Sequence, residues 1–235
     1  MKANPRLAVL LAMIPCAVAA SIAIETQVTL AGDDSAASTG ATNQAAAGDV
    51  DVSRSRVYTF VGKTGFGHEH GVTGRLKAGS IRLGADRDAG QFVFDLTSFS
   101  ADTREARRYV GLEGETDAST QEQVTTNMLG AYVLDTEHYP TATFVIKSAL
   151  PLRGNQPDGV KRYQLEGQFT LHGVTRPLRI FAEARAESGA IRLRGAFVML
   201  QTDYGIKPFS KALGAVGVTD KLKIYGDILI VAAGN

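Results

Sequence analysis

The chain has 235 residues, of which 44% are hydrophobic and 21% are charged, a composition that suits one large or two small globular domains. Its 25 basic and 24 acidic residues nearly cancel, which argues against a nucleic-acid-binding surface. The single cysteine, Cys16, lies in an N-terminal apolar run, so disulfide and thiol chemistry are excluded for the rest of the chain.

An N-terminal secretory signal peptide is predicted over residues 1–19. Two basic residues precede an apolar run that is too short to cross a bilayer comfortably, and Ala17-Val18-Ala19 is a small-x-small cleavage pattern. Cleavage would remove two basic residues and no acidic one, leaving 23 basic and 24 acidic residues and a net charge of −1. We therefore expect a periplasmic or secreted mature protein; lipid attachment at Cys16 is the alternative.

Residues 20–53 are expected to form a flexible tether, because most of them are small or polar and show no period. The folded domain is expected to cover residues 54–235. There, apolar and polar residues alternate in eight segments, a period typical of strands with one buried face. The eight expected strands are residues 56–63, 71–84, 91–99, 143–149, 163–172, 178–187, 190–205 and 220–232.

Interruptions of the alternation predict local features. The slip at Gly79-Ser80 indicates a β-bulge in the second strand. Between the fifth and sixth strands, GVTRP at 173–177 predicts a short loop in which Gly173 turns the chain and Pro177 stands at a strand entry.

One segment lacks the period of two. Ser119 followed by Glu122 has the spacing of a capping box, and Gly130 suits a helix stop, so we expect a helix at about 120–129. A further turn of helix is expected over residues 104–109.

Together these elements predict an all-β fold, an eight-stranded antiparallel barrel with a helical insertion after the third strand. A two-sheet sandwich is the alternative, but closure into a barrel removes the exposed strand edges. A barrel of this size is either filled by side chains or holds one small ligand.

The inward-facing rows favour a cavity over a filled barrel. Small residues stand mid-strand between aromatic or branched neighbours, which leaves room along the barrel axis; glycines that relieve tight bends in a filled barrel are the alternative. The walls are apolar and nearly uncharged, so the ligand would be long and apolar. The small residues are Ala78, Gly167, Ala182, Ala184, Gly195 and Gly226, and the expected cavity side chains are Phe60, Leu76, Phe92, Phe94, Phe144, Ile146, Phe169, Ile180, Phe197, Met199 and Ile224.

Six sequence segments occur in the order found in a known family. They are YTFVGKTGFGHEHGVTGRL, FDLTSFSADT, HYPTATF, LEGQFTLHGVTRPL, TDYGI and VTDKLKIYGDILI. By their order, the chain resembles the YceI-like family of periplasmic polyisoprenoid-binding, lipocalin-like proteins over about residues 55–232. The resemblance implies a lipocalin-like eight-stranded barrel that encloses the tail of an isoprenoid-type ligand, and it implies binding rather than catalysis.

His68 and His70 stand two residues apart and would share one face of a strand at the barrel mouth. Two imidazoles could chelate a transition metal with a third ligand from His138, His172 or Glu69. A His-x-His pair alone is a weak signal, so we expect these histidines to be polar rim residues near a ligand head group, with no metal or other cofactor.

A basic cluster follows Asp102 in the sequence. Arg107 and Arg108 are candidates for binding a phosphate head group through paired guanidinium hydrogen bonds. The alternative is a solvated helical turn in which they pair locally with Glu105 or Glu113, which is the more common outcome for surface charge clusters.

No nucleophile elbow, phosphate loop or zinc-protease helix occurs in the sequence. We therefore expect a binding protein, not an enzyme, that sequesters or carries a long apolar ligand of the isoprenoid or lipid type. The alternatives are a metal-dependent or redox role through His68 and His70, and a ligand-free structural or stress module. Apart from that ligand, we expect no nucleic-acid partner and at most transient membrane contact; a homodimer is left open.

Overall fold

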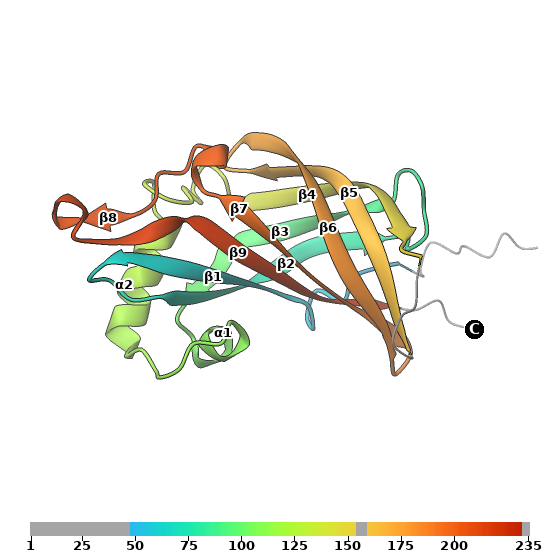
Figure 1. The fold of residues 1–235 in the computed structure, drawn as a ribbon, viewed down its shortest axis with the longest axis horizontal. Coiled ribbons are helices and arrows are strands. Elements are labelled where there is room, and N and C mark those ends of the chain that lie inside the picture. The colour runs from blue at the N-terminus through green and yellow to red at the C-terminus, as the bar shows by residue number, and fades with distance from the viewer. Residues whose placement is uncertain (1–47, 154–158, 232–235) are drawn as a thin grey trace, which may run out of the picture. The chain divides into compact units, whose positions relative to one another are not determined.

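The computed structural model describes residues 48–153 and 159–231, and within them the chain forms one closed antiparallel sheet (Figure 1). The first strand also pairs with the last, so the predicted barrel is confirmed. The expected signal peptide lies outside the described residues. The eight long strands of the wall are β1 (Arg56–Gly65), β2 (His70–Ile81), β3 (Gly90–Ala101), β4 (Thr141–Pro151), β5 (Val160–Leu171), β6 (Val174–Glu187), β7 (Ala190–Leu200) and β9 (Val216–Val231).

The helical insertion after the third strand is also confirmed. Two helices, α1 (Arg104–Tyr109) and α2 (Ala118–Leu129), follow β3. The N-cap of α2 is Asp117 rather than the start of a capping box, because its carboxylate accepts a backbone N–H of the first turn at 3.0 Å. Ser119 therefore lies inside the helix. The helix ends at Leu129 with Gly130 as its C-cap, as expected.

The seventh strand is shorter than expected. β7 ends at Leu200, and the chain then turns through a 3₁₀ helix, Thr202–Tyr204. A ninth, two-residue strand, β8 (Ser210–Lys211), folds back on the beginning of β9.

In the first strand, the face that was expected to point into the barrel points outward instead. Val57 and Val61 line the interior, so Phe60 lies on the outer face and its expected place among the cavity residues is wrong. The sequence misleads here because the outer face of β1 is apolar as well. Tyr58 is 6% exposed and stacks on Tyr109 of α1, with ring centroids 3.7 Å apart.

The bulge in β2 lies earlier than expected. Its pairing with β3 shifts register between Leu76 and Ala78 rather than at Gly79-Ser80. A bulge adds a residue to one strand and inverts the alternation beyond it. Leu76 is therefore buried, whereas Ala78 is exposed and does not face inward.

A tight turn at His172-Gly173 joins β5 to β6. Both residues have positive φ (50° and 75°), the conformation that two-residue hairpin turns require. Pro177 lies inside β6 rather than at its entry. Because β6 begins to pair with β7 at Phe181, this part of the strand has one sheet neighbour and tolerates a missing N–H.

The folded domain begins before Arg54. Val50 is 9% exposed and forms a bridge with Ile230, and its N–H donates to the Gly79 carbonyl at 3.0 Å. Residues 48–53 therefore belong to the barrel and not to the expected tether, whose remainder lies outside the described residues.

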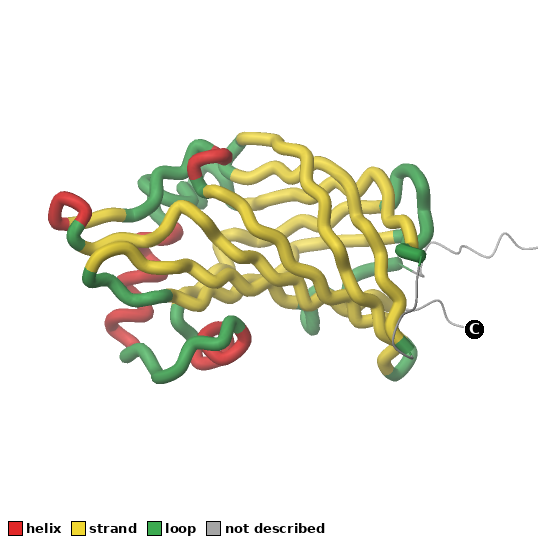
Figure 2. Tube along the Cα trace, in the orientation of Figure 1, coloured by secondary structure: helices red, strands yellow, loops and turns green. Residues whose placement is uncertain are grey.

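The two halves of the barrel interior differ. Near the β2–β3 connection the interior is filled, and Ile81, Ile146 and Ile230 are each 1% exposed. In the other half, inward-facing Phe197 and Ile224 are only partly buried, which indicates a hollow interior. Figure 2 shows the helices gathered at this second end of the barrel.

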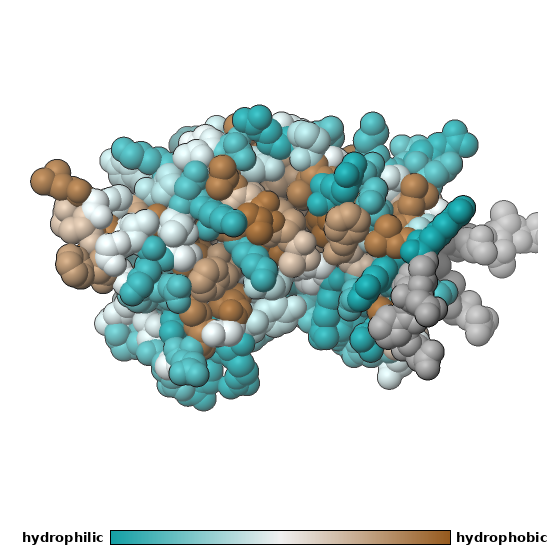
Figure 3. All heavy atoms as spheres, viewed as in Figure 1, coloured by the Kyte–Doolittle hydropathy of each residue, from teal (hydrophilic) through white to brown (hydrophobic). Residues whose placement is uncertain are grey.

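The outer wall carries polar and apolar side chains side by side (Figure 3). Phe181 on β6 and Val198 on β7 are 58% and 51% exposed. Among the helices that the structure describes, none combines the length and the hydropathy needed to cross a bilayer.

Candidate functional site

A cavity of about 230 Å³ occupies the hollow half of the barrel. All eight long strands and α2 contribute to its described lining, which is almost entirely apolar. The polar side chains in this lining are Thr59, His70, Asn127 and Gln201, and of these His70 is the one that can carry a charge. An apolar wall with a few polar groups is typical of a small-molecule binding pocket.

Gly226 contributes open space to this cavity. A Cβ atom at Gly226 would meet nothing closer than Ile228 Cγ1 at 3.7 Å. Gly195 also lines the cavity, but a Cβ there would approach two neighbouring atoms at 3.1 Å. Gly167 is required for packing instead, because a Cβ there would lie 2.0 Å from a β4 carbonyl oxygen. Among the other expected small residues, Ala182 lines the cavity and Ala184 is buried in the wall.

Most of the side chains expected to face a cavity lie in its lining. Leu76 and Ile146 are exceptions: they are 4% and 1% exposed, within the core but outside the described lining. Phe60, as described above, faces outward. The expected residues in the lining are Phe92, Phe94, Phe144, Phe169, Ile180, Phe197, Met199 and Ile224.

The helical insertion supplies lining residues that sequence reasoning missed. Val124 and Met128 of α2 both line the cavity. They stand four residues apart, a spacing that places both on one face of a helix, so the signal was present in the sequence. The helix is fixed to β3 by the Ala101 N–H, which donates to the Thr125 hydroxyl at 3.0 Å.

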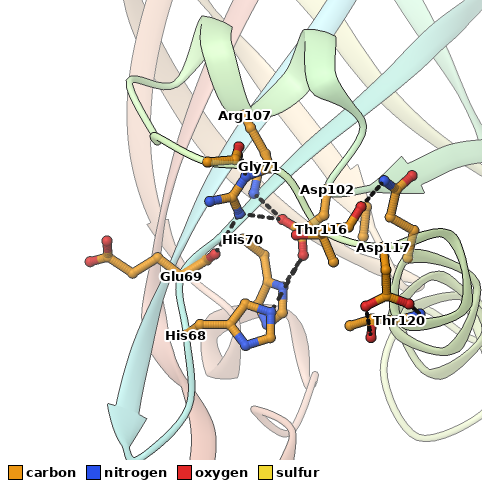
Figure 4. Close-up of polar contacts among 12 residues, drawn as sticks. His68, Glu69, His70, Gly71, Asp102, Arg107, Thr116, Asp117 and Thr120 are labelled. Atoms are coloured by element: carbon orange, nitrogen blue, oxygen red, sulfur yellow. Dashed lines mark hydrogen bonds and ion pairs between the residues drawn. The ribbon is translucent and has the colours of Figure 1, made fainter.

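A polar cluster stands at the cavity rim, where His70 joins the lining (Figure 4). His70 Nδ1 lies 2.7 Å from Asp102 Oδ2, and His68 Nε2 lies 3.7 Å from the same oxygen. The cluster forms because Val72 of β2 pairs with Ala101 of β3, which brings the residues beyond that pair together. Sequence reasoning missed Asp102 as a partner of the histidines because this contact depends on the register of two strands.

The Asp102 carboxylate is completely buried and fully engaged. Its Oδ1 accepts the Gly71 N–H at 3.0 Å and Arg107 Nη1 at 3.2 Å, and its Oδ2 faces His70. Burial alone would raise the pKa of Asp102, but the hydrogen bonds from His70, Gly71 and Arg107 outweigh it and lower the pKa below its usual value. Asp102 is therefore an ionised carboxylate at neutral pH, and it holds His70 in position.

Arg107 connects the loop before β2 to the helical insertion. Besides Asp102, its guanidinium donates to the carbonyl oxygens of Glu69, Glu113 and Gly114, at 3.3, 2.5 and 3.1 Å. These partners are a buried carboxylate and backbone carbonyls, and not the glutamate side chains expected for local pairing. Arg107 is thus a structural support of the rim.

Close packing of α1 on β2 fixes this support. A Cβ atom at Gly71 would lie 2.9 Å from the Ala106 carbonyl carbon, so the helix rests directly on the strand backbone. Arg108 is separate from the cluster and borders a shallow hollow beside Glu105 and Tyr109.

The three residues that could have supplied a third metal ligand make other contacts. His138 pairs with Asp135 at 2.9 Å, and the His172 ring packs against Tyr139 with centroids 4.5 Å apart. Glu69 contributes its backbone carbonyl to Arg107.

Comparison with known proteins identifies the family of this barrel. A family model described as the YceI-like domain matches residues 49–229. The chain belongs to the YceI-like family. The matched residues include the barrel strands, the helical insertion and the polar cluster, so the resemblance seen in the sequence is confirmed. Among curated proteins, none matches this YceI-like chain.

Two solved structures are similar to this YceI-like barrel. BcnA from Burkholderia cenocepacia superimposes with a TM-score of 0.52 at 16% identity, covering 77% of this chain and 99% of that protein. A polyisoprenoid-binding domain from Saccharophagus degradans, implicated in plant cell wall breakdown, gives a TM-score of 0.55 at 15% identity and covers 79% and 98%. At these identities the likeness shows a common fold.

Proposed function

We propose that this YceI-like protein is a periplasmic or secreted carrier that sequesters a long apolar ligand, of the lipid or isoprenoid type, and catalyses no reaction. The observation that carries the proposal is the cavity of about 230 Å³ with its almost entirely apolar lining. Each Å² of apolar ligand surface that enters it contributes about 25 cal/mol through the hydrophobic effect.

The size of the cavity favours a slender ligand. Its volume lies below the range of about 300–1,000 Å³ that is usual for pockets holding drug-sized molecules. Phe94, Phe169 and Phe197 form an edge-to-face series along the wall, with centroid distances of 6.3 and 5.9 Å. A flexible hydrocarbon chain can pass along such a series, whereas a bulky ring system would displace it.

The polar end of the ligand would lie at the rim beside His70. Nδ1 of this imidazole is engaged with Asp102, so Nε2 is the ring atom that remains for a hydroxyl, carbonyl or phosphate group. Arg107 acts in this proposal by holding Asp102 and the loop, and not by contacting the ligand.

The comparisons support the same class of ligand. The chain belongs to the YceI-like family, and the similar Saccharophagus degradans domain is described as polyisoprenoid-binding. The N-terminal pattern of two basic residues, an apolar run and a small-x-small site supports export from the cytoplasm.

Enlarging Gly226 tests the proposal directly. Gly226→Leu would place a branched side chain in the open space of the cavity, where a Cβ has room. We expect the affinity of delipidated protein for a fluorescent fatty-acid probe to fall at least about tenfold, which corresponds to about 1.4 kcal/mol. Fluorescence titration measures the affinity, and circular dichroism checks the fold.

The matched control is Ala196→Leu, which adds the same side chain to the outer face of β7. This variant should bind the probe like the parent protein. Equal affinity of the parent and the Gly226→Leu variant, with both folded, would contradict the cavity as the binding site.

A further inference from the structure

We propose that His68, His70 and Asp102 form a binding site for a divalent transition-metal ion at the cavity rim. One ligand atom from each residue lies within 4.8 Å of the other two. Figure 4 shows both imidazole rings directed at the same carboxylate. This inference does not rest on the proposed carrier function, because it depends only on the three side chains and their supports.

The distances fit a metal triad after small movements. Metal–nitrogen and metal–oxygen bonds of about 2.0–2.1 Å in a tetrahedral site place neighbouring ligand atoms about 3.3 Å apart. The two distances from Asp102 Oδ2, 2.7 Å to His70 and 3.7 Å to His68, lie on either side of this value. Shifts of about half an ångström in the side chains would bring both of these distances to the tetrahedral value, and the ligand atoms of the two histidines lie within 4.8 Å of each other.

The position of His68 is not explained by hydrogen bonding alone. Its side chain is 56% exposed, yet its Nε2 faces the buried carboxylate at 3.7 Å, which is too long for a hydrogen bond. The His68 ring also packs against the His70 ring, with centroids 4.3 Å apart, and a cation shared by both imidazoles and the carboxylate would stabilise this arrangement. His70 would then carry its proton on Nε2 and bind the metal through Nδ1.

The two oxygens of Asp102 have separate roles. Oδ1 is held by the Gly71 N–H and by Arg107, while Oδ2 is approached by the two histidines. Arg107 and the histidines therefore lie on different sides of the carboxylate, as Figure 4 shows. The guanidinium orients the carboxylate without occupying the place of the metal, which is the usual role of a partner outside the ligand sphere.

The donor set indicates the class of metal. Two imidazoles and one carboxylate suit zinc, iron(II) and related divalent ions, and three protein ligands leave at least one coordination position open. Because His70 also belongs to the cavity lining, the metal would lie beside the cavity mouth. Hard ions such as magnesium prefer all-oxygen sites and would not compete.

Metal titration of the chelator-treated protein tests the proposal. Cobalt(II) is added while its visible absorption is recorded, and zinc binding is measured by calorimetry. We expect one ion per chain, and a binding constant at least about 100-fold weaker in His68→Ala and His70→Ala, since even partners outside the ligand sphere are worth 10–100-fold. Asp102→Asn should have the same effect, provided that circular dichroism shows it folded.

His138→Ala is the matched control, because His138 also pairs with an aspartate but, among the described residues, belongs to no group of three possible metal ligands. It should bind metal like the parent. Because His68 is mostly exposed, its removal should leave the fold intact and keep the test decisive. Absence of binding in the parent protein, or equal binding in the parent and the His68→Ala variant, would overturn the proposal.

Discussion

Phe169 shows how a single side chain supports both the core and the cavity wall. It is 6% exposed, and its ring lies edge-on to Phe94, Phe197 and Tyr204 at centroid distances of 5.7–6.3 Å. The preceding residue, Gln168, is exposed on the outer face of the same strand. The two positions therefore report separately on the inside and outside of the barrel.

Truncation of these two residues should have very different effects. Phe169→Ala removes a buried aromatic ring and should lower the free energy of unfolding by about 3–5 kcal/mol. Gln168→Ala, at the surface, should change it by no more than about 0.5 kcal/mol. Urea denaturation measures both values. Similar losses at the two positions would mean that the strand is buried on both faces, contrary to a barrel.

Individual residues were predictable where the alternation along a strand was unambiguous. The inner positions of β5 and β7 follow directly from their apolar rows, and Phe169 and Phe197 lie in the lining as expected. Phe60 was not predictable in this way, because the outer face of β1 is apolar as well and its Tyr58 stacks on Tyr109 of α1. Asp102 was missed as a partner of the histidines because His70 is more than thirty positions away in the chain.

Residues 48–53, the N-terminal segment that pairs with the barrel, are more ordered than their composition indicates. Residues 48–53 are mostly small or polar, and nothing in their pattern indicates a strand. Their order comes from pairing with distant segments: the Asp51 N–H donates to the Leu229 carbonyl at 2.9 Å, and the Ile81 N–H donates to Gly48 at 2.7 Å. Such contacts close the filled end of the barrel.

A chain that begins at Arg54 should be less stable than one that begins at Gly48. The shorter chain loses the buried Val50 side chain, which alone is worth about 1.5–3 kcal/mol, and leaves its backbone partners without these bonds. The midpoint of urea denaturation compares the two chains. Val50→Asp in the longer chain should reproduce much of the loss, whereas equal midpoints for the two chains would show that the segment adds no stability.

Other elements also show that contacts between distant segments are not predictable from local sequence. Period-two alternation predicted the eight long strands, and the loss of that period together with the stop signal at Gly130 predicted α2, because both signals depend on near neighbours in sequence. The bulge in β2 was misplaced near Gly79, since its position depends on how β2 pairs with β3. The apolar face of α2 was recognisable from Val124 and Met128, but its role in the lining follows only from its packing on the barrel.

For the described barrel as a whole, the division into a filled half and a hollow half is the central feature. The filled half contains residues such as Ile81 and Ile146, and it provides the stability that disulfides provide in many small proteins. The hollow half has the cavity, α2 and the polar cluster around Asp102 at its rim. A barrel divided in this way can hold an apolar chain without losing its core.

Native mass spectrometry of the purified protein tests this account most directly. We predict a bound apolar compound at up to one molecule per chain, released by organic solvent and identifiable as a lipid or isoprenoid chain. The Gly226→Leu variant, purified in the same way, should lack it, while Ala196→Leu should retain it. The account would be contradicted if the spectrum of the parent protein showed only the mass of the polypeptide, both as purified and after incubation with a total lipid extract.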